Sequence, residues 1–252
     1  MAKRLIRGRR WLWLGAALFL GLVIARAPAA LVGALLPAGA VTLAEPSGTV
    51  WNGSAEMQLR QAPLGLLSWR WLPGALASGE LGVSVDLQGE GLDASGIVHV
   101  GPGQLVLAEG RGQLDAQALQ RLLGAYDLGA NGSLRLDGVQ VTRADDGYRS
   151  ATGTVHWEGG TLAYRMQGRR YEASLPPMRA PLAVEGRTLT LVARPLQPVG
   201  AAGTAPLLRL ALRPDGWFVA GASRAFIELA GQPWQGTTSA SDIVLEVEEK
   251  LF

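Results

Sequence analysis

Two histidines are the side chains in this sequence best suited to acid–base or metal chemistry, because the chain contains no cysteine. His99 and His156 each lie in a run of alternating apolar and polar residues. No Asp, Glu or second His stands at a metal-ligand spacing from either of them. The lack of cysteine also excludes disulfide bonds, cysteine–zinc sites and thiol catalysis. We therefore interpret both histidines as polar strand residues, and we expect no catalytic residue, no metal and no cofactor.

Three other stretches resemble parts of functional motifs. Asp145 and Asp146 offer two carboxylates to a cation, but the glycine that follows them is typical of a hairpin tip. Gly101–Gln104, "GPGQ", resembles a phosphate loop, yet it has no lysine and no helix pattern follows it. Ser54 in "NGSAE" lacks the second glycine of a nucleophile elbow. These stretches favour turns, and the protein is predicted not to be an enzyme.

The composition favours strands and turns over long helices. Of the 252 residues, 34 are Gly and 14 are Pro, and 48% are hydrophobic while only 17% are charged. The first 26 residues contain six of the 23 Lys and Arg and none of the 21 Asp and Glu. The other 17 basic and 21 acidic residues give the rest of the chain a net charge of −4. Nucleic-acid binding needs clustered cations on the folded part, so we exclude this class.

The N-terminus has the pattern of a membrane anchor. A basic cytoplasmic tail, residues 1–10, precedes an anchor and apolar connector, residues 11–36, which begins with 15 uncharged residues. That uncharged run spans roughly 22 Å, less than a hydrocarbon core of about 30 Å, so flanking side chains must reach the interfaces. The cations before it favour a cytoplasmic N-terminus and export of the rest. The predicted anchor flanks are Lys3, Arg4, Arg7, Arg9, Arg10, Trp11, Trp13 and Arg26.

A cleavable signal peptide is the competing interpretation of the same residues. Ala25–Ala27, "ARA", has the small-x-small form of a cleavage site, but Pro28 would follow the cut and disfavours it. We favour a retained anchor, and cleavage stays open. Both interpretations place residues 45–252 on the far side of the membrane, with a single pass at most.

Beyond the connector, the apolar residues alternate with polar ones, which is typical of strands with one dry and one wet face. Leu81–Leu87 and Leu208–Leu212 follow this pattern, and in "LRLDGVQV" the phase slips across Gly138, which predicts a β-bulge. Residues 115–123 break the pattern and predict one short amphipathic helix, with Asp115 as its N-cap. The sequence therefore predicts a mainly β, antiparallel domain over residues 45–236.

The short helix divides this domain into halves of about 45–114 and 130–236. Because "SGTVWNG" at Ser47–Gly53 resembles "TGTVHWEGG" at Thr152–Gly160, two related β halves are one possibility. The fold is then a sandwich, and the alternative is a single curved sheet. A C-terminal tail, residues 237–252, has no role that the sequence assigns.

Tryptophans form the other conspicuous pattern. Trp51 and Trp157 each follow a valine-bearing strand pattern and precede a glycine, as expected for large core residues where two sheets meet. Trp69 and Trp71 share one face of a predicted strand. We expect Trp51, Trp69 and Trp157 in the core, and Trp71 either in the core or in an exposed contact.

"GTVWNGSA" followed by "WRWLPGALASGELGVSVDLQG", with "ATGTVHWEGG" later, resembles protein N of the bacterial type II secretion system. The matching positions are Gly48, Thr49, Val50, Trp51, Gly53, Trp69, Pro73, Leu76, Gly79, Leu81 and Trp157. The order of basic tail, anchor and β-rich exported domain resembles that family over most of the chain. The resemblance implies a single-pass inner-membrane component of the machine that exports folded proteins from periplasm to exterior. It implies no catalytic residues, and its partners would be other inner-membrane components and membrane lipids.

A second interpretation stays open. An anchored, exported β domain can curl a long sheet into an apolar groove that handles lipids in envelope biogenesis, and the low-charge strands suit this role equally well. The inner face of the sheet distinguishes the two hypotheses. A packed interior favours assembly, whereas an open apolar trough favours a lipid ligand.

Overall fold

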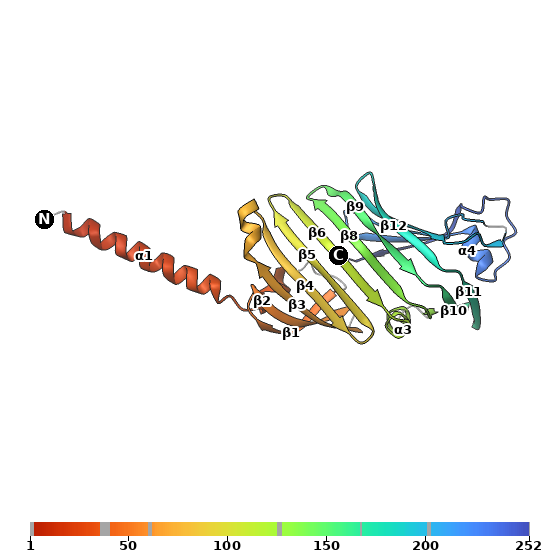
Figure 1. The fold of residues 1–252 in the computed structure, drawn as a ribbon, viewed down its shortest axis with the longest axis horizontal. Coiled ribbons are helices and arrows are strands. Elements are labelled where there is room, and N and C mark those ends of the chain that lie inside the picture. Colours follow the sequence, from red (N-terminus) through yellow and green to blue (C-terminus); the bar gives the residue numbers. More distant parts are fainter. Residues whose placement is uncertain are drawn as a thin grey trace.

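The computed structural model describes residues 3–35, 41–59, 62–124, 128–166, 168–200 and 203–251. A long N-terminal helix projects from one end of an elongated, strand-rich body (Figure 1). The described helices are α1 (Lys3–Ala25), α2 (Ala30–Leu35), the 3-10 helix η1 (Pro73–Ser78), α3 (Ala116–Gly124) and α4 (Arg224–Leu229).

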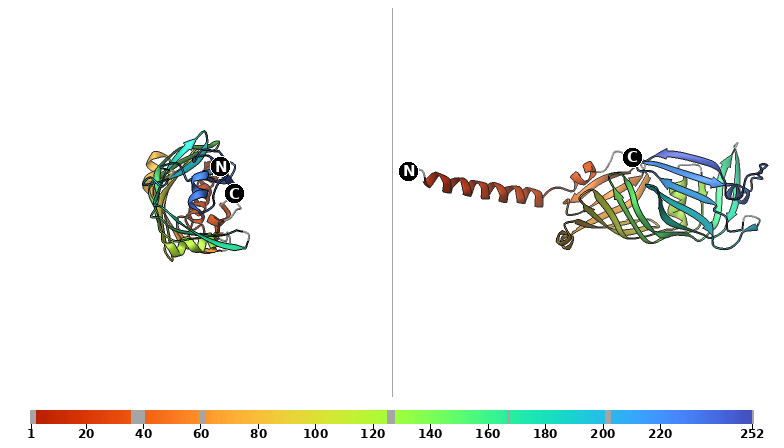
Figure 2. Two further views of the ribbon diagram at one scale, coloured as in Figure 1. Left: turned by 90° about the vertical axis from the view of Figure 1, so that its right-hand side faces the viewer. Right: turned by 90° about the horizontal axis from the view of Figure 1, so that it is seen from above.

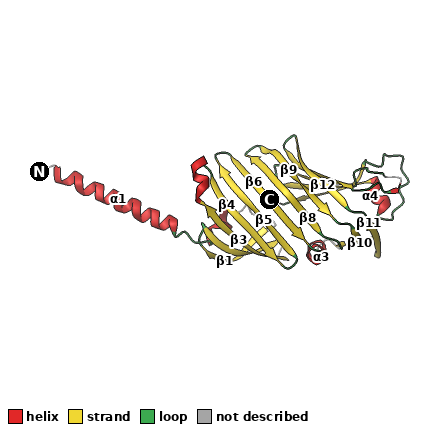
Figure 3. Ribbon diagram, in the orientation of Figure 1, coloured by secondary structure: helices red, strands yellow, loops and turns green. Residues whose placement is uncertain are grey.

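Thirteen of the described strands form one antiparallel sheet (Figure 3). Neighbours in this sheet are neighbours in sequence except where β7, β10 and β11 are left out, and these three form a small separate sheet. The strands of the large sheet are, in order, β1 (Val41–Gly48), β2 (Asn52–Leu59), β3 (Ala62–Leu72), β4 (Leu81–Gly89), β5 (Leu92–Gly101), β6 (Gln104–Leu114), β8 (Leu134–Ala144), β9 (Gly147–Trp157), β12 (Met178–Glu185), β13 (Thr188–Pro195), β14 (Leu208–Leu212), β15 (Trp217–Ser223) and β16 (Ile243–Lys250). The small sheet contains β7 (Leu128–Ala130), β10 (Gly160–Met166) and β11 (Arg169–Leu175). The predicted mainly β, antiparallel class is confirmed, as a curved sheet and not a sandwich.

The register gives the large sheet one apolar face. Val85 pairs with Trp69 on one side and Gly96 on the other, and Leu107 pairs with Val98 and Val141. Since directly opposed residues point to the same face, these rows form a continuous apolar surface across the strands. Arg70 and Ser84, which lie between them, are polar and face the other way. The predicted alternation of one dry and one wet face is confirmed.

The sheet curves around the helices at its two ends (Figure 2). At one end, Ala29 and Val32 at the start of α2 pack on Ala55 and Trp69. At the other end, Ala225 and the neighbouring apolar residues of α4 pack on the sheet, in a cluster that contains Trp157, Leu175, Met178, Ala180, Ala193 and Leu207. The apolar face is therefore packed in two separate clusters, and other buried apolar residues, such as Leu92 and Val139, lie outside them.

A β-bulge in β8 keeps the apolar face continuous. The register between β8 and β9 shifts between Asp137 and Gln140, and Gly138 has a φ of 60°. The extra residue lets Val139 point to the same face as Leu136 despite the slip in their spacing. On the facing strand the register also shifts, at Glu109, whose φ is 53°. The bulge predicted at Gly138 is confirmed, and paired irregularities of this kind increase the local bend of a sheet.

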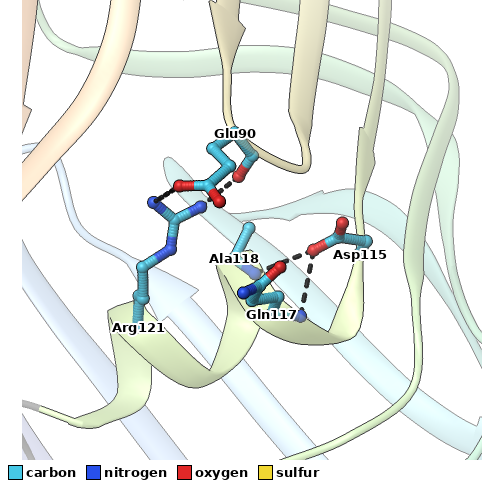
Figure 4. Close-up of polar contacts among 5 residues, drawn as sticks. All are labelled: Glu90, Asp115, Gln117, Ala118 and Arg121. Carbon is cyan, nitrogen blue, oxygen red and sulfur yellow. Dashed lines mark hydrogen bonds and ion pairs between the residues drawn. The ribbon is translucent and has the colours of Figure 1, made fainter.

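Helix α3 lies where the sequence predicts its short helix. The Asp115 carboxylate accepts hydrogen bonds from the backbone N–H groups of Gln117 (2.9 Å) and Ala118 (2.8 Å), which confirms it as the N-cap (Figure 4). Arg121 pairs with the Glu90 carboxylate at 3.2 Å and also donates to the Glu90 carbonyl. These contacts fix α3 to the turn between β4 and β5. Helices α2 and α4 were not predicted as separate elements.

The two similar stretches do not occupy equivalent positions. Ser47–Gly53 spans the end of β1, a turn and the start of β2, whereas Gly153–Trp157 lies inside β9. The structure therefore gives the proposed repeat no support. The stretches share residue types that suit closely packed strands.

Among the residues that the structure describes, no helix combines the length and hydropathy that crossing a membrane requires. Large apolar side chains of α1 from Trp13 to Ile24 are 49–70% exposed. The side chains of Lys3, Arg4, Arg7, Arg9, Arg10 and Trp11 lie outside the described part.

The crowding at the bulge gives a stability prediction. Gly153 has a φ of 116°, and a Cβ there would lie 2.7 Å from the Val139 Cα atom. Gly186 has a φ of 63° but nothing within 4 Å of such a Cβ. We expect Gly186→Ala to cost about 1 kcal/mol of backbone strain, and Gly153→Ala about 3 kcal/mol because it adds a steric clash. Thermal unfolding of the two variants measures this difference, and equal melting temperatures would contradict it.

Candidate functional site at the helix–sheet junction

The turn between β1 and β2 closes on itself through backbone and hydroxyl groups. Thr49 N–H donates to the Asn52 carbonyl at 2.9 Å, and Asn52 N–H donates to Thr49 Oγ1 at 3.2 Å. Gly48, with a φ of 87°, lies so close that a Cβ would be 2.5 Å from the Asn52 carbonyl oxygen. A Cβ on Gly53 would lie 2.6 Å from the Ser47 carbonyl oxygen and 2.7 Å from the Trp69 ring. Both glycines are therefore required by close approach.

This turn holds the chain that leaves α1. Val50 N–H donates to the Ala27 carbonyl at 3.0 Å, and Ala29 N–H donates to the Gly48 carbonyl at 3.1 Å. Pro28 and Thr49 form an isolated β-bridge between these bonds. The connector after α1 is thus paired to the turn as a short extra strand.

Trp51 contacts α1 directly. Its indole N–H donates to the backbone carbonyl of Ile24, in the last turn of α1, at 2.8 Å. The Ala27 N–H donates to the same carbonyl at 3.2 Å, so the Ile24 oxygen accepts two hydrogen bonds at the end of the helix. The indole ring lies 5.3 Å from the ring of Trp71 at a tilt of 55°, which is a favourable aromatic geometry. Trp51 therefore clamps the end of α1 to the sheet.

Trp69 contacts the backbone of the turn from the sheet. It is 5% exposed, and its indole N–H donates to the Thr49 carbonyl at 3.1 Å. Ala55 and Ala29, each 1% exposed, pack with it in the same cluster. The ring therefore joins the apolar face of the sheet to the backbone of the turn.

The structure brings most of the predicted motif together. Gly48, Thr49, Val50, Trp51, Gly53 and Trp69 meet at this junction. Trp69 and Trp157 are buried, as predicted. The prediction of Trp51 as a buried core residue between two sheets is wrong, because Trp51 is half-buried and one sheet is present at this point. Trp157 ends β9, away from this junction, in the cluster that contains Met178.

The second part of the motif forms the corner after β3. Pro73 begins η1, and Gly79 ends it with a φ of 76° and an N–H directed to the Ala75 and Leu76 carbonyls. Proline is well suited to the first position of such a helix and glycine to its end. Leu76 is 55% exposed. This corner directly follows Trp71 and so lies at the same strand ends as the junction.

Ile24, Ala27, Ala29 and Ala55 were missed as parts of the site. The first three contribute backbone groups, which carry no residue-type signal, and Ala55 contributes only a small side chain. The small residues on either side of Pro28 are the one sequence signal for this site, because small side chains let the connector approach the backbone of the turn closely.

The two histidines and Asp146 each lie beside a charged side chain. His99 Nδ1 lies 3.4 Å from a Glu80 oxygen, and His156 Nε2 lies 3.9 Å from an Asp137 oxygen. In the described part of the chain, no group of three or more His, Cys, Asp or Glu residues could hold a metal ion. Asp146 pairs with Arg149 at 2.7 Å and with Arg187 at 3.1 Å. Both Asp145–Gly147 and Gly101–Gln104 form hairpin turns, as predicted.

The bond from Trp51 to Ile24 gives a local prediction. Trp51→Phe keeps an aromatic ring but removes a hydrogen bond worth about 1 kcal/mol, so the junction should open about fivefold more often. We expect faster hydrogen exchange at the Ala29 and Val50 amides, measured on the full-length protein, with the rest of the sheet unchanged. Trp71→Phe is the matched control, because among the described residues the buried Trp71 indole N–H has no acceptor. Equal effects of the two variants would show that the Ile24 bond does not hold the junction.

Comparison with known proteins places this arrangement in one family. Residues 39–237 match a family model described as type II secretion system (T2SS), protein N. No curated protein and no solved structure is similar enough to the chain to be matched with it.

Proposed function

The chain belongs to the type II secretion system protein N family, and from this membership we propose that it is a non-enzymatic structural component of the secretion machine, anchored in the bacterial inner membrane. The family match makes the chain a component of a type II secretion system, whose place is the cell envelope. The anchor, its single-pass topology with a cytoplasmic N-terminus, and the absence of catalysis are the proposed parts. The partners in this proposal are other inner-membrane components of the machine.

The clamp between Trp51 and the end of α1 is the observation that carries the proposal. A flexible tether would only hold the domain near a membrane, whereas a helix end bonded to the sheet at Ile24, Ala27 and Ala29 fixes the orientation of the domain relative to the helix. Fixed orientation is of use to a protein that must meet other anchored subunits in one geometry.

The apolar surface of α1 supports the anchor. Trp13, Phe19 and Leu22 are 70%, 70% and 57% exposed, so the rest of the chain does not cover them. Exposed apolar surface is unfavourable in water by about 25 cal/mol per Å², and a bilayer removes this cost. The cations before Trp11 orient the helix with its N-terminus in the cytoplasm.

The proposal predicts that anchoring itself is required for secretion. Residues 1–20 are replaced by a cleavable signal peptide in one variant and by a foreign single-pass anchor in another, and both variants keep Ile24 and the junction. In cells that lack the native gene, the released form should leave type II substrates in the periplasm, and the foreign anchor should restore their export. Substrate in the medium and in the periplasm is measured by immunoblot, with equal domain levels as the control. Full export by the released form would refute the anchor.

A lipid-handling role is the second candidate, and one observation favours it. Between the two packed ends, the apolar face has an open hollow of about 220 Å³ that no described helix covers. The apolar residues that line it are Leu67, Val85, Leu87, Ala94, Leu107, Leu136 and Val139. An acyl chain has the shape and chemistry that such a surface accepts.

The lipid hypothesis has a matched pair of variants on one strand. Leu107 faces the hollow and Val106 the opposite side of the sheet, and both are half-buried. If lipid binds, photoreactive palmitate should label the wild-type protein and Val106→Asp, and Leu107→Asp should lose most of the label because a charge is costly beside an acyl chain. Equal labelling of both variants would remove this candidate and leave the assembly role in place.

A further inference from the structure

Strand β16 ends the large sheet and lies beyond the part of the chain that matches the family. It spans Ile243–Lys250, whereas the match ends at residue 237. It pairs with β15 along one side, from Trp217 opposite Lys250 to Ser223 opposite Ile243. In the described sheet it has no neighbour on its other side. The tail to which the sequence assigns no role therefore forms a complete edge strand.

The two edges of the sheet differ in how they are protected. Edge strand β1 contains Pro46, and Glu45 beside it has a φ of 49° where the register with β2 shifts. Proline and a distorted backbone are the usual devices that keep another strand from pairing with an edge. Strand β16 has eight residues and no proline, and its register is regular from Trp217 to Ala222 of β15. It is the edge that remains able to accept another strand.

The side chains of β16 show which strand would fit. Leu245 and Val247 continue the apolar face opposite Ala222 and Ala220, but they are 53% and 59% exposed. On the other face, Glu246 and Glu248 are exposed. The strand thus presents Leu245 and Val247 on one face, followed by Glu249, and two negative charges on the other, followed by Lys250.

A second copy of this chain meets like charges at this edge when the two strands pair about Val247. Antiparallel pairing centred on Val247 places Glu246 of each copy opposite Glu248 of the other, and like charges directly opposite each other destabilise a sheet. A strand with Lys or Arg at these positions instead gains two opposite-charge pairs. We propose that β16 binds an extended segment of another protein that alternates basic and apolar residues, and extends the sheet by one strand.

This binding is testable with a defined peptide on the full-length protein in detergent. The probe is a fluorescent heptapeptide that alternates lysine and valine, and its control is a peptide of the same composition with the lysines grouped at one end. Anisotropy should show about tenfold tighter binding of the alternating peptide, because the grouped one cannot place its charges on one face. A photoreactive valine in the probe should label residues 243–250.

Charge reversal supplies the matched variants. Glu246→Lys with Glu248→Lys should weaken binding of the lysine peptide by about tenfold, and should create binding of a glutamate–valine peptide. Glu56→Lys with Asp93→Lys makes the same change in net charge at exposed positions elsewhere on the sheet and should leave binding unchanged. Equal loss in both double variants would reduce the effect to overall charge and overturn the proposal. So would labelling outside β16, or a concentration-dependent dimer of the wild-type protein that excludes the peptide. None of these outcomes depends on whether the chain acts in secretion.

Discussion

The structure depends on one constraint: a single sheet must keep most of its apolar side chains on the same face across thirteen described strands. Among the described strands no second sheet of similar size lies against it, so a strand out of phase would turn its apolar residues to water. The bulge at Gly138 and the left-handed Glu109 are local departures from regular pairing that keep β6 and β8 in phase. Gly153 is then required, because β9 passes too close to the bulge for any side chain. The sheet is also curved. Its curvature lets the apolar face pack around α2 and α4.

The helices that pack on the curved apolar face are too short to cover it. Helix α2 and helix α4 have six residues each and pack at opposite ends, so the middle of the face keeps its hollow. Ser223, fully buried, fixes α4 by accepting a hydrogen bond from Phe226 N–H at 3.2 Å. At the other end α2 follows the connector that the turn at Thr49 holds. Helices α2 and α4 are thus held by separate contacts, and no described helix is held over the centre of the apolar face.

Much of this fold could be predicted from the sequence, for definite physical reasons. Alternation identifies strands because one face of a strand contacts water and the other contacts apolar side chains. The slip in this alternation at Gly138 predicted the bulge for the same reason. Alternation does not say what covers the dry face, so a sandwich and a curved sheet gave the same pattern. Helix α4 was missed because six residues are too few to show a helical period. Trp51 was assigned to a core because a large aromatic usually lies there, and its acceptor, a backbone carbonyl 27 residues earlier, leaves no trace in residue types.

Because that acceptor is a backbone carbonyl, a motif without catalytic or metal-binding side chains can still define a site. Trp51 bonds to the carbonyl of Ile24 and not to its side chain, and the bonds at Ala27 and Ala29 are also to backbone. The junction therefore requires a helix that ends at this place and small residues after it, but it is indifferent to the side chain at position 24. The specific requirements lie on the sheet side, where Gly48 and Gly53 permit close approach and Trp69 supports the turn. Helices of different sequence can thus carry the same domain in the same orientation. The residue types that the junction requires therefore begin at the turn and not in the helix.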